Sequence, residues 1–394
     1  MLLANRHETQ THPERDSAGI QRDSHLKARE RVPFFKALLA LLLLILGIAG
    51  CSGTTPVAHA PAFVYAANNG SNNVSAFSVT PASGALTAVS GSPFPAGTSP
   101  AAMATDPAGK FVYVANVGSN NISAYAVNPA SGALTTVPGS PFSTGVGPTG
   151  ITVSPSGRFA YVGAAPGVLA NTIDPASGAL AAIAGSPFAS DAANVAVDPS
   201  GKFLFASGFN LNNLSAFTIN PSSGALTPAP GSPFTAGVGK NPLGLVVDLS
   251  GHFLYLGNTA DGTISAFSID QGNGTPTPMA GSPFATGSDP RSLSVDPKGN
   301  FLFAGTFGDG KVSGYTIGAS GGLTPITGSP FTVGAGILGV AVDPSGKFLY
   351  VADNSPGSVR VLSLNASGAP TPITGSPFAA GSGTEAVVVT AKIQ

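Results

Sequence analysis

After residue 51 the chain alternates short apolar segments with turns, and no apolar spacing typical of a helix appears. Four kinds of segment recur. The best examples are an apolar segment over 338–343, an aromatic and β-branched segment over 348–352, an alternating segment over 122–127 and a proline-containing segment over 134–139. Residues 343–346 carry proline and glycine where a tight turn favours them. The pattern predicts four short β-strands per unit, the fourth at a sheet edge because proline cannot donate to a neighbouring strand.

The tetrapeptide Gly-Ser-Pro-Phe occurs seven times, at intervals of 46 to 50 residues. Its phenylalanines are Phe94, Phe142, Phe188, Phe234, Phe284, Phe331 and Phe378. Seven units of four strands predict an all-β fold, a seven-bladed β-propeller of four-stranded antiparallel blades. The first unit starts at its second strand, residues 63–67, and the last ends with a spare first strand, residues 386–390. We therefore expect the C-terminal strand to pair with the first blade and close the ring. The phenylalanines are expected to pack between blades, with seven ligand pockets as the alternative.

Residues 37–49 form an unbroken apolar run that, as a helix of 1.5 Å rise per residue, is too short for a bilayer core of about 30 Å. Basic residues precede the run, which ends at Ile48-Ala49-Gly50-Cys51 and resembles the lipobox of bacterial lipoproteins. The resemblance implies cleavage before Cys51 and acyl chains on Cys51; an ordinary buried thiol is the alternative. By the sorting pattern of that family, Ser52 rather than Asp after the cysteine implies the outer membrane. A translation start at Val32 would give a more compact signal.

These observations predict three regions: a leader and signal peptide over 1–50, a lipidated tether over 51–60 and the propeller over 61–394. We expect a monomer in the bacterial cell envelope, held to the membrane through lipid on Cys51, with the side of the outer membrane left open. Two acyl chains or more give stable anchoring where one does not.

Composition narrows the classes of function. Only 9% of the 394 residues are charged and the net charge is −1, which argues against a nucleic-acid partner because such partners need a dense basic patch. The 52 Gly and 35 Pro reflect repeated turns rather than disorder. One cysteine excludes an intramolecular disulfide and a cysteine-based zinc site. Asp261 and Asp309 are isolated acids, whereas Ca²⁺ needs six to eight oxygens, so we expect no metal and no cofactor.

The segments Phe111-Val-Tyr-Val-Ala-Asn116 and Asn121-Ile-Ser-Ala-Tyr125 resemble the YVTN-type repeat of bacterial surface propellers. Residues 61–394 as a whole resemble the seven-bladed lactonase family, which includes 6-phosphogluconolactonase-like and muconate-cycloisomerising enzymes. The resemblance implies a site at one end of the central channel. There an Arg and a His begin one innermost strand, and an Asn-Glu pair follows at the end of the next strand. Arg291 matches the family Arg, but Ser292 stands at the His position, and Thr306 and Phe307 stand at the Asn-Glu positions.

One column of residues can be compared around the ring without reference to any family. Five positions before the turn aspartate or its equivalent, the seven innermost strands carry Ala101, Thr149, Ala193, Leu243, Arg291, Leu338 and Glu385. Only Arg291 and Glu385 are charged. Three interpretations stay open: a pair that neutralises the channel rim, a catalytic pair in which Arg291 polarises a carbonyl and Glu385 is the base, and a simple binding role. Ser292 has no His partner in the sequence to activate it as a nucleophile.

The loops between the second and third strands, and those leading to the next unit, differ more from unit to unit than the other turns. Strand alternation places both sets on the face that holds Arg291 and Glu385, and loops on a rigid scaffold commonly carry recognition. The predicted ligand-binding face comprises Lys240, Asn241, Asp289, Ser292, Lys311 and Asp353. Neutral drift of repeats would give similar variation.

The sequence thus predicts a lactonase-like propeller without the family's catalytic His and Glu. We expect it to serve as a binding or scaffold module for a small molecule, a glycan or a protein. Carbohydrate stacking would depend on Phe209 and Phe307, because the chain has no Trp. The alternative is a lactone hydrolase that uses Arg291 and Glu385.

Overall fold

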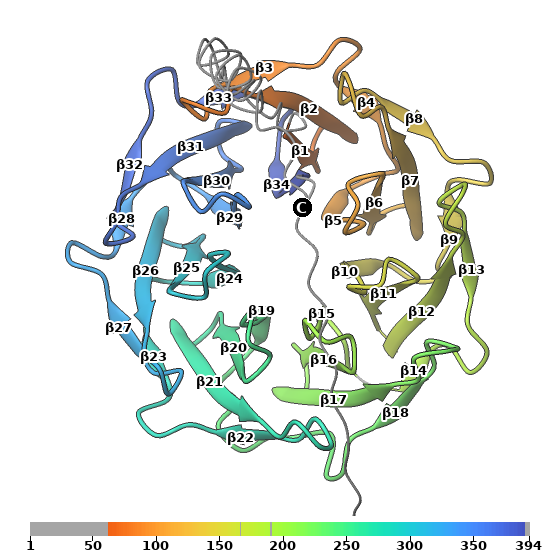
Figure 1. Ribbon diagram of the computed structural model, residues 1–394, viewed down its shortest axis with the longest axis vertical. Coiled ribbons are helices and arrows are strands. Elements are labelled where there is room, and N and C mark those ends of the chain that lie inside the picture. Colours follow the sequence, from red (N-terminus) through yellow and green to blue (C-terminus); the bar gives the residue numbers. More distant parts are fainter. Residues whose placement is uncertain (1–61, 166, 190, 391–394) are drawn as a thin grey trace, which may run out of the picture. The chain divides into compact units, whose positions relative to one another are not determined.

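The computed structural model describes residues 62–390 except residues 166 and 190, and within that range the elements are strands (Figure 1). The predicted leader, the tether and Cys51 lie outside the described residues. Seven antiparallel sheets surround a central channel, each sheet forming one blade. We number the blades in chain order, so that blade 1 contains β1 and blade 7 contains β30. The predicted seven-bladed all-β propeller is confirmed.

Every blade has the same strand order from the channel outwards. The innermost strands of blades 1 to 7 are β34 (Thr384–Thr390), β5 (Pro100–Thr105), β10 (Pro148–Val153), β15 (Asn194–Val197), β19 (Pro242–Val247), β24 (Pro290–Val295) and β29 (Ile337–Val342). The second strands are β1 (Phe63–Asn68), β6 (Phe111–Asn116), β11 (Phe159–Ala164), β16 (Phe203–Gly208), β20 (Phe253–Asn258), β25 (Phe301–Thr306) and β30 (Phe348–Asp353).

The third strands are β2 (Asn73–Val79), β7 (Asn121–Val127), β12 (Gly167–Ile173), β17 (Asn213–Ile219), β21 (Thr263–Ile269), β26 (Lys311–Ile317) and β31 (Ser358–Leu364). The outer strands are β3 (Leu86–Ala88), β8 (Leu134–Thr136), β13 (Leu180–Ala182), β18 (Leu226–Pro228), β22 (Pro276–Pro278), β27 (Leu323–Pro325) and β32 (Pro370–Pro372).

The ring closes as the sequence predicts. β34 pairs antiparallel with β1, with Phe63 opposite Thr390 and Ala67 opposite Ala386, so the last strand of the chain becomes the innermost strand of blade 1. This pairing removes the free sheet edges that an open ring of blades would leave.

The outer edge of each blade differs from the prediction of one continuous fourth strand. The strand predicted over 134–139 ends at Thr136, and a two-residue strand then pairs with the other half of the third strand in six blades. These short strands are β4 (Phe94–Pro95), β9 (Phe142–Ser143), β14 (Phe188–Ala189), β23 (Phe284–Ala285), β28 (Phe331–Thr332) and β33 (Phe378–Ala379). The Gly-Ser-Pro-Phe motif spans the break, because a residue with positive φ and a proline both interrupt an edge strand.

The motif's serine and phenylalanine explain its sevenfold repetition. In every blade the serine Oγ accepts a hydrogen bond from a backbone N–H of the third strand at 2.9–3.0 Å. This bond satisfies a donor that the break in the edge strand would leave unpaired. All seven phenylalanines pack against apolar clusters formed by neighbouring blades. The prediction that they pack between blades is therefore confirmed.

Polar contacts fix the blades to one another and complete the turns. Tyr65 and Tyr113 are fully buried and donate from their hydroxyls to the carbonyls of Gly132 and Gly178, each in a turn of the next blade. Burial raises the pKa of both tyrosines, so they remain neutral donors. The turn aspartates act as expected: Asp106 Oδ1 accepts hydrogen bonds from two backbone N–H groups at 2.6 and 2.7 Å. The rigid ring that results positions the loops at its two ends.

Candidate functional site at the channel mouth

A cavity of about 330 Å³ lies where the innermost strands of blades 3 to 6 begin. Backbone hydrogen bonds such as Val117 N to Ser99 O join the two variable loop sets, which shows that both lie at this end of the ring. The cavity is lined by Gly147, Thr149, Ala165, Asp191, Ala192, Ala193, Phe209, Asn210, Leu243, Thr259, Asp289 and Arg291. Its volume is at the small end of the range for ligand sites in proteins.

Among the described residues that line this cavity, Arg291 is the positively charged one. It is the second residue of β24, and its Nε and Nη2 both lie 2.9 Å from Asp289 Oδ2. Its guanidinium also lies over the ring of Phe307, 4.6 Å from the ring centroid. Both contacts hold the guanidinium in one orientation. Asp289 adopts a φ of 58°, in the left-handed region where Asp is tolerated better than most residues, just before the proline that starts β24.

Glu385 is the second residue of β34 and half-buried. Burial raises the pKa of its carboxyl group, while a hydrogen bond from the Asn69 side chain and the charge of Arg291 oppose that shift. Arg291 therefore acts on Glu385 through the longer-range attraction of its charge and forms its ion pair with Asp289. Arg291 thus forms its ion pair with Asp289, which lies just before β24, rather than with Glu385.

The residues at the family's other catalytic positions have structural partners. Ser292 Oγ accepts a hydrogen bond from Val340 N at 3.1 Å and so links β24 to β29 of the next blade. Thr306 is fully buried, and Phe307 lies under the guanidinium of Arg291. Ser292 lies between two blades, and nothing in its hydrogen bonding activates its hydroxyl.

Lys240 and Asn241 lie in the loop that leads to β19. Lys240 is exposed, and its backbone N–H donates to Asp261 Oδ2 at 2.7 Å. Asn241 donates from its backbone to Asn212 Oδ1 at 2.7 Å and from Nδ2 to the Phe209 carbonyl at 3.1 Å. Asn241 thus holds the loop of blade 4 that carries Phe209, which lines the cavity.

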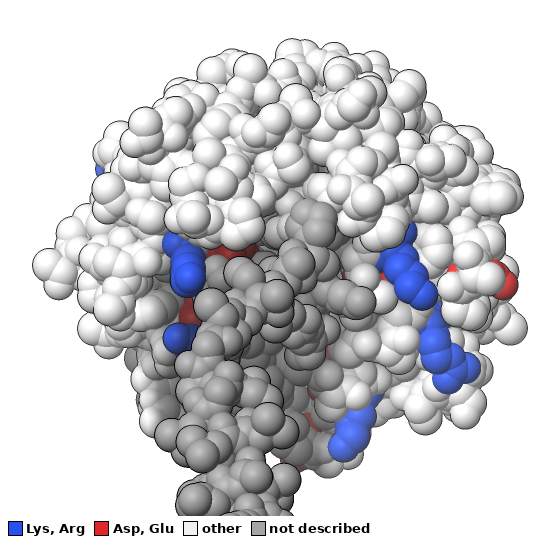
Figure 2. All heavy atoms as spheres, turned by 45° about the horizontal axis from the view of Figure 1, so that its top comes forward, with Lys and Arg blue, Asp and Glu red and all other residues white. Residues whose placement is uncertain are grey.

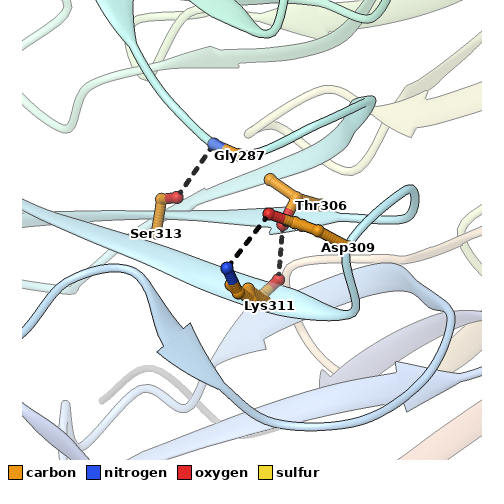
Figure 3. Close-up of polar contacts among 5 residues, drawn as sticks. All are labelled: Gly287, Thr306, Asp309, Lys311 and Ser313. Carbon is orange, nitrogen blue, oxygen red and sulfur yellow. Dashed lines mark hydrogen bonds and ion pairs between the residues drawn. The ribbon is translucent and has the colours of Figure 1, made fainter.

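Lys311 belongs to a polar cluster in blade 6 (Figure 3). Its Nζ lies 3.7 Å from Asp309 Oδ2. Thr306 Oγ1 lies 2.5 Å from Asp309 Oδ1 and 2.9 Å from the Lys311 carbonyl oxygen. Asp309 is therefore fixed by a hydroxyl and faces a partly exposed ammonium group. Lys311 does not line the channel-mouth cavity.

Asp353 is placed differently from the expectation of a ligand-facing residue. Its side chain is fully buried, with Oδ2 2.6 Å from Arg360 Nε and Oδ1 accepting a hydrogen bond from Gly336 N at 3.2 Å. In blade 1 the corresponding position is Asn68, which donates to Ser75. Asp353 and Arg360 therefore replace an internal Asn–Ser hydrogen bond by an ion pair within the blade.

Asp191 and Asn210 are among the cavity residues that the sequence did not single out. Asp191 lies in the loop before β15, and Asn210 lies in the loop between β16 and β17. Asp191 Oδ2 accepts backbone hydrogen bonds from Asn210 and Leu211 at 2.7 and 2.8 Å. The one sequence signal was the loop from Phe188 to Asp198, which is two residues shorter than usual.

Charge is sparse over the described surface. Most of the described residues on the face drawn in Figure 2 are neither acidic nor basic. Within residues 62–390, apart from the two gaps, no three His, Cys, Asp or Glu side chains gather closely enough to hold a metal ion. The same part of the chain contains no helix long and apolar enough to span a membrane.

The fold and the channel-mouth cavity define a seven-bladed propeller with a candidate site at one end of its channel. The family described as "Lactonase, 7-bladed beta-propeller" matches residues 52–146, 136–237, 239–325 and 280–386, and the chain belongs to this family. No curated protein sequence matched the chain.

Solved structures share the fold at low sequence identity. A proposed 6-phosphogluconolactonase from Bacteroides uniformis ATCC 8492 has a TM-score of 0.71 and 19% identity, over 84% of this chain and 99% of that one. The periplasmic gluconolactonase PpgL of Pseudomonas aeruginosa has a TM-score of 0.69 and 19% identity over the same shares of the two chains. At this identity the likeness establishes the common propeller fold.

Proposed function

We propose that this protein is a lipid-anchored propeller of the bacterial cell envelope that binds its ligand at the channel mouth without chemical turnover. The observation that carries the proposal is the state of Arg291, whose charge is paired with Asp289 and whose guanidinium is stacked on Phe307. A paired Arg presents fixed N–H donors with little net charge, which suits recognition of a polar ligand. Ser292, Thr306 and Phe307 stand where the resemblance implies a His and an Asn-Glu pair.

A second candidate function is hydrolysis of a lactone, a cyclic ester. The observation that favours it is the raised pKa of Glu385 near the charge of Arg291. A carboxylate with a raised pKa is a better general base near neutrality, and an Arg can polarise the ester carbonyl. Sugar lactones are the first substrates to test, because the structural neighbour PpgL is described as a periplasmic gluconolactonase.

One assay separates the two functions. The full-length protein, purified in a detergent without a sugar head group, is incubated with a panel of sugar and aliphatic lactones beside the Arg291→Ala variant. Binding alone predicts hydrolysis at the background rate for both proteins. Turnover that disappears in Arg291→Ala would establish the hydrolase and overturn the non-enzymatic proposal.

The proposed anchor depends on Cys51. The Cys51→Ala variant, expressed in a bacterium that processes lipoproteins, should move from the membrane fraction to the soluble fraction, because two or three acyl chains supply the stable attachment. A variant that stays in the membrane fraction would contradict the lipid anchor.

A further inference from the structure

The departures from blade regularity gather between blades 3 and 4. β15 has four residues where the other innermost strands have six or seven, and only two residues separate β11 from β12. In blade 4, Phe234 forms an isolated bridge with Leu214 in place of the short outer strand of the other blades. A second cavity, of about 520 Å³, lies at this place.

The second cavity adjoins the channel mouth. It is lined by Ala165, Asp191, Asn210, Leu211, Asn213, Ser215, Phe217, Pro228, Ser232 and Pro233. Ala165, Asp191 and Asn210 also line the channel-mouth cavity, so the two spaces share a wall of three residues. Leu211 is 64% exposed, more than any other large apolar side chain among the described residues. We refer to the two adjoining cavities together as the groove.

Blade 4 has also lost a polar contact that other blades keep. In blades 1 and 2 an Asn ends the second strand, and its Nδ2 donates at 2.8 Å to the Asn that begins the third strand, as Asn116 does to Asn121. Blade 4 has Gly208 opposite Asn213, although the φ of Gly208 is not positive. Asn213 is only 5% exposed, and its Oδ1 has no hydrogen-bond partner. A buried amide oxygen without a donor is costly in a protein interior.

We infer that the groove binds a neutral oligosaccharide, with one sugar unit in the cavity between blades 3 and 4. The inference rests on the proposed binding role of the channel mouth. Among the described residues the second cavity has no Lys or Arg, which disfavours an anion, and its polar lining includes Asp191 and Asn210, whose side-chain types exchange hydrogen bonds with hydroxyl groups. Leu211, Pro228 and Pro233 supply the apolar surface for the C–H face of a sugar ring. The two adjoining cavities, of about 520 and 330 Å³, give room for more than one linked unit.

The test is calorimetric titration of the full-length protein, in a detergent without a sugar head group, with glucose, cellotriose and maltotriose. At least one trisaccharide should bind about tenfold more tightly than glucose. The Leu211→Ser variant should bind that trisaccharide about tenfold more weakly, because the substitution removes exposed apolar surface from the groove and leaves the core unchanged. Leu249→Ser is the matched control, because Leu249 is 51% exposed in the turn after β19 and lines neither cavity. The Leu249→Ser variant should bind the trisaccharide as tightly as the wild type does.

Gly208→Asn gives a second and independent check. The new side chain would displace Asn213, a residue of the cavity wall, because Asn213 Oδ1 lies 1.9 Å from the position of the added Cβ. Trisaccharide binding should fall while the midpoint of thermal unfolding does not. Absence of binding by both trisaccharides, or equal binding by wild type, Leu211→Ser and Gly208→Asn, overturns the groove. Binding lost in Arg291→Ala but unchanged in the two groove variants also overturns it, while leaving the proposed function in place.

Discussion

The buried ion pair of blade 7 provides the sharpest test of the energetics. Asp353 has no exposed side-chain surface, and its Oδ2 lies 2.6 Å from Nε of Arg360, which is 26% exposed. The perturbation is Arg360→Ser, the residue type that blade 1 has at the equivalent position, Ser75. It leaves the carboxylate of Asp353 buried with the Gly336 N–H as its remaining donor.

Removing one partner of a buried ion pair costs about 3–5 kcal/mol. Because Arg360 is partly exposed, we take the lower end, about 3 kcal/mol. At an unfolding entropy of about 2.1 cal/mol/K per residue over about 330 residues, this corresponds to a fall in Tm of about 4 °C.

The double variant Asp353→Asn/Arg360→Ser separates loss of the pair from loss of side-chain volume. It rebuilds the Asn68–Ser75 arrangement and also supplies a donor near Ser358, whose Oγ has no partner. We expect it to recover most of the lost stability. Chemical denaturation and calorimetry measure both variants against the wild type. A single variant as stable as the wild type, or a double variant no more stable than the single, would refute the reasoning.

Two further predictions concern buried groups. Tyr113→Phe removes the hydrogen bond to the Gly178 carbonyl and should lower the free energy of unfolding by about 1–3 kcal/mol. Denaturant titration measures this difference, and an unchanged free energy of unfolding would mean that the bond contributes nothing. Burial raises the pKa of the Glu385 carboxyl group, so the folded state holds the carboxyl proton more strongly than the unfolded state does. The free energy of unfolding that Glu385 contributes therefore falls as pH rises from 4.5 through the folded pKa. Glu385→Gln should therefore match the wild type at pH 4 and exceed it in denaturation midpoint at pH 8, and equal midpoints at both pH values would contradict this.

Much of the fold was predictable because its determinants are local. Alternating apolar positions and Asp-Pro-x-Gly turns or close variants repeat along the chain, and the spare strand over 386–390 by itself indicates ring closure. The outer edge was predicted less well. The sequence pattern placed the fourth strand over 134–139, whereas the chain breaks after Thr136 and resumes at Phe142, because the serine of Gly-Ser-Pro-Phe takes over a hydrogen bond of the third strand.

The places of Arg291 and Glu385 in their strands were predictable, but their contacts were not. The column comparison placed Arg291 and Glu385 at the start of their innermost strands, and the structure has them there. It could not show that Asp289, two residues away, holds the guanidinium, since that depends on a left-handed backbone at Asp289. Asp353 looked like a loop residue available to ligands, but its carboxylate turns inward to Arg360 on the neighbouring strand.

The sequence by itself determined the number of blades, the order of their strands and the way the ring closes, because period, strand alternation and turn chemistry act over a few residues. Tertiary structure alone decided which polar groups became partners and where space was left open. Those outcomes depend on side chains brought together from separate strands: Gly208 opposite Asn213, Asp353 beside Arg360, and two shortened loops meeting between blades 3 and 4. A cavity arises from the sum of such small differences, and no single segment of the chain encodes it.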